Sequence, residues 1–345
     1  MKFTPKFKFA IVGHGLSLFN FYKQLKKYKF PDPILITHEK KYHKRDLNEY
    51  SGFKNLYYDI SLLNNKIKIF YIKDINNHKV IDILLENKVD YIFSFSSRFL
   101  FKRKLLNQFK NRVFNIHSSF LPEERGGGVF TYRILRSRFF CSSTIHIVNE
   151  DIDSGDIILQ SRKKAISKNS LPINFIDTTT KINSKLTNTF LQKLDKKKEF
   201  KTTHQSNKVY SYLPRFYTEK MALIDWSFKG KDISSLIQAC SKPYKGASTK
   251  INLKNKKIKL HILKAKFFKD KNSHPILSGK IFFHSNTHIK VFVSDGYLMI
   301  YYKDIVFSGL NKRKVNLNLL GKTLYNSYND LEESKKYIAN VFKFK

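Results

Sequence analysis

The chain has 345 residues, of which 41% are hydrophobic and 27% charged, so we expect a globular protein with about two domains. Lys and Arg outnumber Asp and Glu by 65 to 27, a formal net charge of +38. No apolar run approaches the roughly 20 residues that span a bilayer, so no membrane span is expected. Cys141 and Cys240 lie far apart without a CxxC pair. This excludes a disulfide framework, and we expect a cytoplasmic protein with reduced thiols.

The positive charge is spread along the whole chain and consists mostly of Lys. Lys, Asn, Ile, Phe and Tyr are abundant, whereas Gly and Pro are scarce. A bias toward A- and T-rich codons produces such a composition, so a solvated lysine-rich surface is the first interpretation. Attraction to nucleic acids or other polyanions is the second.

The first 160 residues alternate strand-like and helix-like patterns. Apolar runs typical of buried strands occupy residues 9–15, 33–39, 66–72, 89–97, 112–119 and 144–150. Helical spacing is found between several of them, at residues 16–28, 79–88 and 125–138. This alternation predicts the α/β class, with a Rossmann-like, mostly parallel sheet and helices on both faces.

The pattern changes in the second half. Residues 177–200 have the spacing of a long amphipathic helix, and the polar stretch 201–208 predicts a linker. A helix within 226–247 is followed by short strand patterns at 257–268, 279–285, 289–295 and 297–305. Short strands at regular spacing predict a smaller β-rich, OB-like barrel. We therefore expect one domain over 1–200, a linker over 201–208 and a second domain over 209–345.

Glycine and polar residues fall at the ends of several predicted strands. They are Gly13, His14 and Gly15 in the first, Ser96 and Ser97 in the fourth, and Asn115 and His117 in the fifth. Ligands of open α/β sheets bind at the carboxyl ends of strands, so these residues predict one site. The Gly-His-Gly turn is no complete GxGxxG motif, which argues against a dinucleotide-binding oxidoreductase. It is either a tight turn or a backbone nest for an anion.

Asn115, His117 and Asp153 together suffice for acyl transfer between amines. Residues two apart in a strand face the same side, so Asn115 and His117 can enter one cleft. An amide donor stabilises the oxyanion of a tetrahedral intermediate, and an imidazole transfers the amine proton. Asp153 lies in an acidic turn and can orient the imidazole. The alternative is that these are ordinary polar residues at a strand end and in turns.

The joint pattern resembles a known family. Its elements are Asn115-x-His117-x-x-x-Leu121-Pro122-x-x-Arg125-Gly126 followed by Asp153-Ser-Gly-Asp156. In order and spacing it is similar to the 10-formyltetrahydrofolate-dependent formyltransferases, which act on glycinamide ribonucleotide, methionyl-tRNA or nucleotide sugars. The resemblance implies that Asn115, His117 and Asp153 are catalytic and that the Leu121–Pro122 peptide is cis.

The resemblance also implies binding residues around this trio. The formyl donor 10-formyltetrahydrofolate would contact Ser96, Ser97, Arg98, Phe99, Asp151, Ile152 and Ser154. The acceptor substrate would contact Gly13, His14, Gly15, Arg125 and Gly126. No metal is expected, because the spacing of the histidines fits no known metal site.

The second half contains weaker matches to methionyl-tRNA-formyltransferase-like proteins. They are Pro214-Arg215, Ile224-Asp225-Trp226, Ile237-Gln238-Ala239 and Pro243-Tyr244-x-Gly246-Ala247. Glycinamide ribonucleotide enzymes lack this region, so the resemblance disfavours that branch. Residues 38–60 do not resemble the Gly- and Pro-rich insertion that contacts tRNA, and His117-Ser118-Ser119 replaces the common His-Pro-Ser.

These departures order the candidate functions. Formyl transfer to a nucleotide-linked amino sugar comes first, and formylation of initiator methionyl-tRNA is the alternative. A catalytically dead nucleic-acid-binding scaffold is a third interpretation, against which the intact trio argues. The expected partners are thus an amino-sugar nucleotide or an aminoacyl-tRNA, and a homodimer is compatible with the pattern.

Overall fold

The computed structural model describes residues 6–50, 63, 65–206, 210–253, 256–308 and 318–336. Residues 51–60 and the end of the predicted linker, 207–208, lie outside this description. Contacts divide the chain into two compact units. The first comprises Met1–Val129, Phe140–Ser167 and Asn174–Leu213, and the second comprises Phe130–Phe139, Lys168–Ile173 and Pro214–Lys345.

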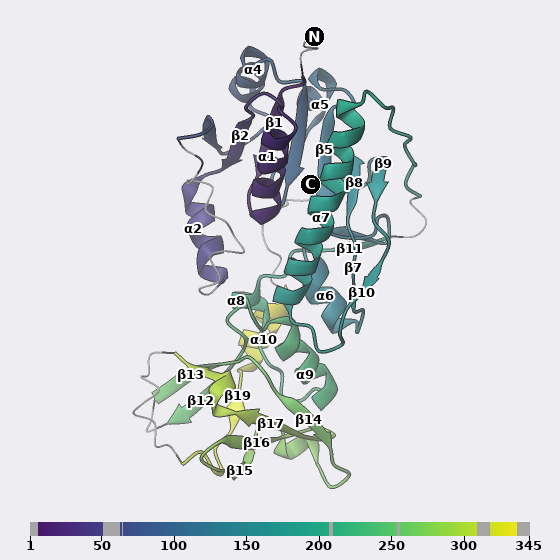
Figure 1. The fold of residues 1–345 in the computed structure, drawn as a ribbon. Helices are drawn as coiled ribbons and strands as arrows, with labels where there is room; N and C mark the ends of the chain where they lie inside the picture. Colours follow the sequence, from purple (N-terminus) through teal and green to yellow (C-terminus); the bar gives the residue numbers. More distant parts are fainter. Residues whose placement is uncertain are drawn as a thin grey trace. The chain divides into compact units, whose positions relative to one another are not determined.

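A seven-stranded sheet forms the centre of the first unit, in the order β3-β2-β1-β4-β5-β8-β9 (Figure 1). The strands are β1 (Phe9–Gly13), β2 (Ile34–His38), β3 (Ile69–Ile72), β4 (Tyr91–Phe95), β5 (Val113–His117), β8 (Thr144–Ile147) and β9 (Ile157–Gln160). Strands β1 to β5 pair in parallel, whereas β8 and β9 are antiparallel. The predicted mostly parallel sheet is thus confirmed.

Helices pack on both faces of this sheet, as predicted. Helices α1 (Leu16–Lys27) and α7 (Pro172–Asp195) lie together on one face in Figure 1. There Phe21 and Phe190 pack with Phe9 and Ile11 of β1. Helices α4 (His78–Glu86) and α5 (Arg103–Gln108) belong to the other face, where Ala10 and Val12 are buried. The alternation along β1 therefore supplies both cores.

Some boundaries differ from the predicted ones. Helix α7 begins at Pro172, before the predicted residue 177, because proline is well suited to the first turn of a helix. The predicted helix over 125–138 is shorter, with β6 (Glu124–Gly126) preceding α6 (Val129–Leu135). Strand β6 pairs with β11 (Ser211–Leu213), a distant partner that the local pattern does not reveal. Helix α2 (Lys40–Glu49) was not predicted.

The second unit is rich in antiparallel strands, as predicted. Its two sheets have the orders β18-β13-β12-β19 and β14-β17-β16-β15. The strands are β12 (Ala247–Leu253), β13 (Lys256–Ile262), β14 (Lys266–Lys269), β15 (Ile281–His284), β16 (His288–Val293), β17 (Gly296–Tyr301), β18 (Ile305–Phe307) and β19 (Leu324–Tyr325). The single strand predicted over 257–268 is wrong, because it divides into β13 and β14 of different sheets.

A bridge between Lys280 and Thr323 joins the two sheets. Trp226 packs in their core with residues of both, and its indole N–H donates to Thr249 Oγ1 at 2.9 Å. The remaining elements are α8 (Thr218–Met221), α9 (Gly230–Ala239) and α10 (Tyr328–Lys336), with β7 (Phe140–Cys141) and β10 (Lys164–Ala165) in the first unit. Across the described ranges, no helix has the length and apolar character needed to cross a bilayer.

Candidate active site

The structure brings Asn115, His117 and Asp153 together. Asn115 and His117 lie on β5 with one residue between them, and Asp153 lies in the turn between β8 and β9. His117 Nδ1 is 3.5 Å from Asp153 Oδ2, and Asn115 Nδ2 is 3.4 Å from Asp153 Oδ1. All three are largely shielded from water, which strengthens their electrostatic interactions.

The main chain around His117 fixes which of its nitrogens faces Asp153. His117 Nε2 lies 2.8 Å from the carbonyl oxygen of Glu124, which can only accept a hydrogen bond. Nε2 therefore carries a proton in the neutral ring and Nδ1 is bare. A proton taken up at Nδ1 would lie between the imidazole and the Asp153 carboxylate. His117 can thus hold and release a proton at a defined atom.

His146 is a further member of the site that the sequence interpretation missed. It lies on β8 directly opposite Asn115 and is 2% exposed. Its Nδ1 is 2.9 Å from the carbonyl oxygen of Ile147, so Nε2 is bare in the neutral ring. Nε2 lies 3.1 Å from Asn115 Nδ2 and 3.5 Å from Asp153 Oδ1. His146 therefore orients the Asn115 amide; the only sequence signal was a histidine within an apolar strand.

Asp153 is ionised at neutral pH. Burial by itself would raise the pKa of its carboxyl, but His117, His146 and the Gly126 N–H together hold that pKa well below its usual range. The Gly126 N–H donates to Asp153 Oδ2 at 2.9 Å. Gly126 has a φ of +97°, and a Cβ there would lie 2.3 Å from the carbonyl oxygen of Leu213. The position therefore requires glycine.

Arg125 is directed toward a residue that was not predicted. Its Nη2 donates to Gln205 Oε1 at 3.2 Å, and its guanidinium lies 4.6 Å from the centre of the Tyr210 ring. Arg125 is 5% exposed. Nearby, the Leu121–Pro122 peptide is cis, as the resemblance implied.

The Gly13–Gly15 turn packs against the end of β4. The His14 N–H donates to the carbonyl oxygen of Phe95 at 3.1 Å. A Cβ at Gly13 would lie 1.9 Å from the same oxygen. These contacts favour a tight turn over an anion nest. Burial holds the pKa of His14 well below its usual range, although Asp46 opposes this shift.

The segment Ser96–Phe99, predicted to bind folate, is held by the end of β2. His38 Nε2 accepts from the Arg98 N–H at 2.9 Å, and the His38 ring lies 4.2 Å from the Phe99 ring. Arg98 forms a buried ion pair with Asp46. Ser96 has a positive φ of 49°. No cluster able to hold a metal is found among the residues that the structure describes.

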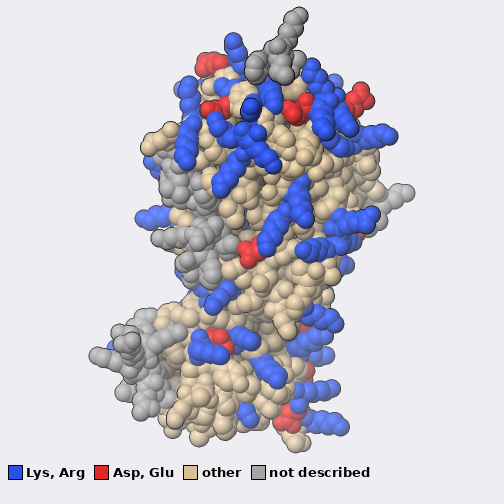
Figure 2. Space-filling view, in the orientation of Figure 1, with Lys and Arg blue, Asp and Glu red and all other residues tan. Residues whose placement is uncertain are grey.

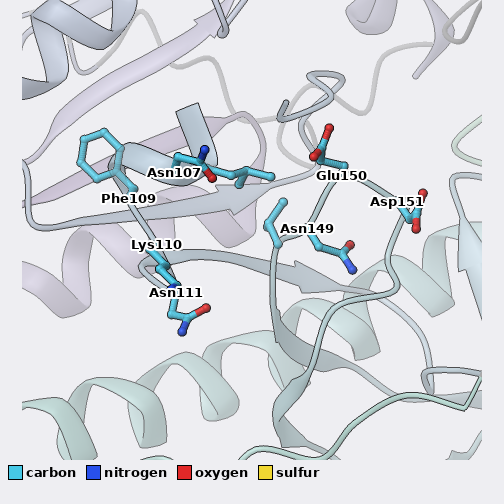
Figure 3. Close-up of a pocket in the computed structure, with 9 residues that line it drawn as sticks. Asn107, Phe109, Lys110, Asn111, Asn149, Glu150 and Asp151 are labelled. Atoms are coloured by element: carbon cyan, nitrogen blue, oxygen red, sulfur yellow. The ribbon is translucent and has the colours of Figure 1, made fainter. Parts of the chain in front are cut away.

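The turn 151–154 borders a shallow pocket of about 370 Å³ (Figure 3). Asn107, Phe109, Lys110 and Asn111 lie on one side, with Asn149, Glu150 and Asp151 on the other. The pocket lies at the start of β5, where the Val148 N–H donates to the Val113 carbonyl at 2.8 Å. Asp151 thus lines a space away from His117, which ends β5. Ser154 Oγ donates to Asn149 Oδ1 at 2.8 Å, and Ile152 lies between them in sequence.

Comparisons with known proteins find relatives over both units. The chain is 29% identical over 289 residues to the bifunctional polymyxin resistance protein ArnA of Wigglesworthia glossinidia brevipalpis, covering 82% of this chain but only 40% of the relative. It is 25% identical to the methionyl-tRNA formyltransferase of Finegoldia magna, over 66% of this chain and 70% of that protein. The fold is similar to that of an N-formyltransferase from Helicobacter canadensis solved with folinic acid and dTDP-3-aminofucose. The TM-score is 0.61 at 18% identity, over 86% of this chain and 98% of that chain.

Two family models also match. The model described as formyl transferase matches residues 6–186, and the model of the formyl transferase C-terminal domain matches residues 217–314. The first covers more than half of the chain and includes the whole trio. The chain therefore belongs to the formyltransferase family.

Proposed function

We propose that this protein transfers a formyl group from 10-formyltetrahydrofolate to the primary amine of a nucleotide-linked amino sugar. The observation that carries this proposal is the convergence of Asn115, His117 and Asp153 within 3.5 Å. They lie in a chain that matches formyltransferase models over both units.

The chemistry follows from the site. The acceptor nitrogen attacks the formyl carbon, a C–N bond forms, and the bond to N10 of the folate breaks. The amine proton passes by way of His117 Nδ1 to N10. The Asn115 amide gives up its long 3.4 Å contact with Asp153 Oδ1 and donates that N–H to the oxyanion. Asp153 keeps its negative charge throughout and stabilises the protonated imidazole. The buried His146 holds the Asn115 amide in the orientation that this requires.

Several observations favour an amino sugar as acceptor. The Helicobacter canadensis N-formyltransferase was solved with dTDP-3-aminofucose, and this chain covers 98% of it. Another neighbour, a 4-N formyltransferase from Francisella tularensis, has a TM-score of 0.51 at 20% identity, over 71% of this chain and 93% of that chain. Residues 38–60 do not resemble the insertion expected of a tRNA-binding relative.

The second candidate acceptor is initiator methionyl-tRNA. It is favoured by the Finegoldia magna relative and by the net charge of +38, because a basic surface attracts RNA. Figure 2 shows Lys and Arg side chains scattered over the visible face rather than gathered in one patch. Scattered lysines are typical of a solvated surface, so the charge favours tRNA only weakly.

An acceptor panel tests the proposal. The protein is incubated with 10-formyltetrahydrofolate and dTDP-linked 3-amino sugars, dTDP-linked 4-amino sugars or charged initiator tRNA, and tetrahydrofolate release is followed by absorbance. His117→Ala serves as the inactive control. Turnover with a sugar nucleotide supports the proposal. Turnover with the tRNA alone would replace it with the second candidate, and folate binding without turnover on any acceptor would contradict both.

A further inference from the structure

Gln205 is a buried side chain near the site that the proposed mechanism does not use. It is 2% exposed, and both ends of its amide are bonded. Nε2 donates to the carbonyl oxygens of Asp153 at 3.0 Å and Gly155 at 2.6 Å. Oε1 accepts from Arg125 at 3.2 Å. A buried glutamine with partners for both ends is fixed in one orientation.

The chain on either side of Gln205 is also anchored to the site. Thr203 and Ile157 exchange backbone hydrogen bonds of 2.9 and 2.8 Å just before it. After it, Tyr210 lies against the Arg125 guanidinium. Residues Ser211–Leu213 then pair in parallel with Glu124–Gly126. The segment therefore joins the Asp153 turn to the strand that carries Arg125 and Gly126.

This arrangement bears on the conformation of Asp153. Its φ of +51° lies in the left-handed region, which a non-glycine residue adopts only when its surroundings hold it there. The Asp153 carbonyl oxygen accepts from Gln205, and its carboxylate accepts from Gly126. Together with the Arg125–Gln205 bond, these contacts form a closed ring of Asp153, Gln205, Arg125 and Gly126.

We propose that Gln205 is a positioning residue, which fixes the Asp153 main chain so that the carboxylate faces His117. It acts through Asp153, because its side chain is buried and its amide is bonded to the Asp153 and Gly155 carbonyl oxygens and to Arg125. The inference rests on the proposed function only in assigning a catalytic role to Asp153. Small displacements at such a site are costly, since about 1 Å of misplacement can reduce a rate about 100-fold.

Two substitutions separate the parts of the Gln205 side chain. Gln205→Met keeps its length and approximate volume but removes all three hydrogen bonds. Gln205→Glu keeps an oxygen facing Arg125 but replaces the donor with a carboxylate oxygen facing two carbonyls. We expect both to lower kcat at least about tenfold. The KM for each substrate should change less than about twofold, because Gln205 is 2% exposed and both ends of its amide are bonded to protein groups.

Gln24→Met is the matched control. Gln24 also belongs to the first unit, donates to the Ser184 carbonyl oxygen at 2.8 Å and accepts from Thr187 at 2.8 Å. It joins α1 to α7 and makes no contact with the trio. We expect it to lower thermal stability while leaving kcat unchanged. An equal loss of kcat in Gln24→Met would mean that any lost glutamine has this effect, and it would overturn the proposal.

A double-mutant cycle with Asp153→Asn distinguishes positioning from general support. If Gln205 acts through Asp153, Gln205→Met should change the single-turnover rate less than about twofold once the carboxylate is gone. An undiminished tenfold effect in the Asp153→Asn background would contradict the proposal. So would a rise in KM without a fall in kcat.

Wild type, Gln205→Met, Asp153→Asn and the double variant also give a thermodynamic cycle that needs no substrate. The acid dependence of the melting temperature reports on the Asp153 environment, and Gln205→Met should reduce the share that Asp153 contributes to it. Full additivity of the two substitutions in this measurement would overturn the positioning role. Failure of the acceptor assignment would instead appear as wild-type protein inactive toward sugar nucleotides, with the stability cycle unaffected.

Discussion

Two segments of the first unit, the Asp153 turn and Ser96–Phe99, are held in place by different kinds of side chain. The Asp153 turn and the Ser96–Phe99 segment each contain a non-glycine residue with positive φ. Each is held by a polar side chain from a distant part of the sequence, Gln205 in one case and His38 in the other. Glutamine does not titrate. His38, by contrast, accepts the hydrogen bond from the Arg98 N–H only while its Nε2 carries no proton.

We expect the two segments to affect different steps, catalysis in one case and donor binding in the other. The Asp153 turn carries the charge that we propose stabilises the protonated His117, so its perturbation should reduce kcat. The Ser96–Phe99 segment is proposed to line the folate pocket, so its perturbation should weaken binding of the donor. Substitutions in the two segments therefore test whether kcat and donor binding depend on different residues.

The largest effect is expected for His117→Ala. It removes the group proposed to hold and release the proton, so kcat should fall about 100- to 10,000-fold. Single-turnover formyl transfer measures this, with circular dichroism as the control for folding. A rate within tenfold of wild type would show that His117 is not the proton-transfer group.

Asp153→Asn should lower kcat by about 100-fold and also change the response of stability to acid. A carboxyl whose pKa is lower in the folded protein stabilises it above the unfolded-chain pKa of about 4. That contribution is lost as the pH falls from there toward the folded-state value. Wild type should therefore melt above Asp153→Asn at pH 7, and the difference should narrow below about pH 4. A difference that widens in acid would contradict the described environment of Asp153.

His38→Ala tests the Ser96–Phe99 segment. The substitution removes the acceptor for the Arg98 N–H and the ring against Phe99, so the folate segment should loosen. We expect the KM for 10-formyltetrahydrofolate to rise about five- to tenfold, with kcat changed less than about threefold. Steady-state kinetics with the donor varied at saturating acceptor measures both. A fall in kcat with unchanged KM would contradict the assignment of the Ser96–Phe99 segment to donor binding.

The smallest effect is expected in the second unit. Lys250 and Ser327 hold the pKa of Asp330 at about 2, and the Lys250–Asp330 pair lies 2.5 Å apart near the surface. Asp330→Asn should lower stability by about 0–1 kcal/mol without changing formyl transfer, because exposed pairs are screened by water. Thermal unfolding and the standard assay check this. A loss of turnover would mean that α10, which carries Asp330, affects catalysis.

The sequence predicted the parts of this molecule that depend on local patterns. The apolar run over residues 9–15 indicated a buried strand, and the spacing of Asn115, His117 and Asp153 indicated a common site. It did not predict His146 or Gln205. Their roles arise from pairings 31 and 52 residues apart in sequence, with Asn115 and Asp153, that no short pattern records. The polar stretch predicted to be a linker therefore contains a buried residue that contacts Asp153.

We propose that Asn115, His117 and Asp153 catalyse the transfer of a formyl group to a sugar-linked amine. The most direct measurement is mass spectrometry of a dTDP-linked amino sugar after incubation with the protein and 10-formyltetrahydrofolate, beside His117→Ala. We expect an N-formylated sugar nucleotide with wild type and a rate at least about 100-fold lower with the variant. Formylation at equal rates by both proteins, or none by wild type with any amino-sugar nucleotide, would contradict it.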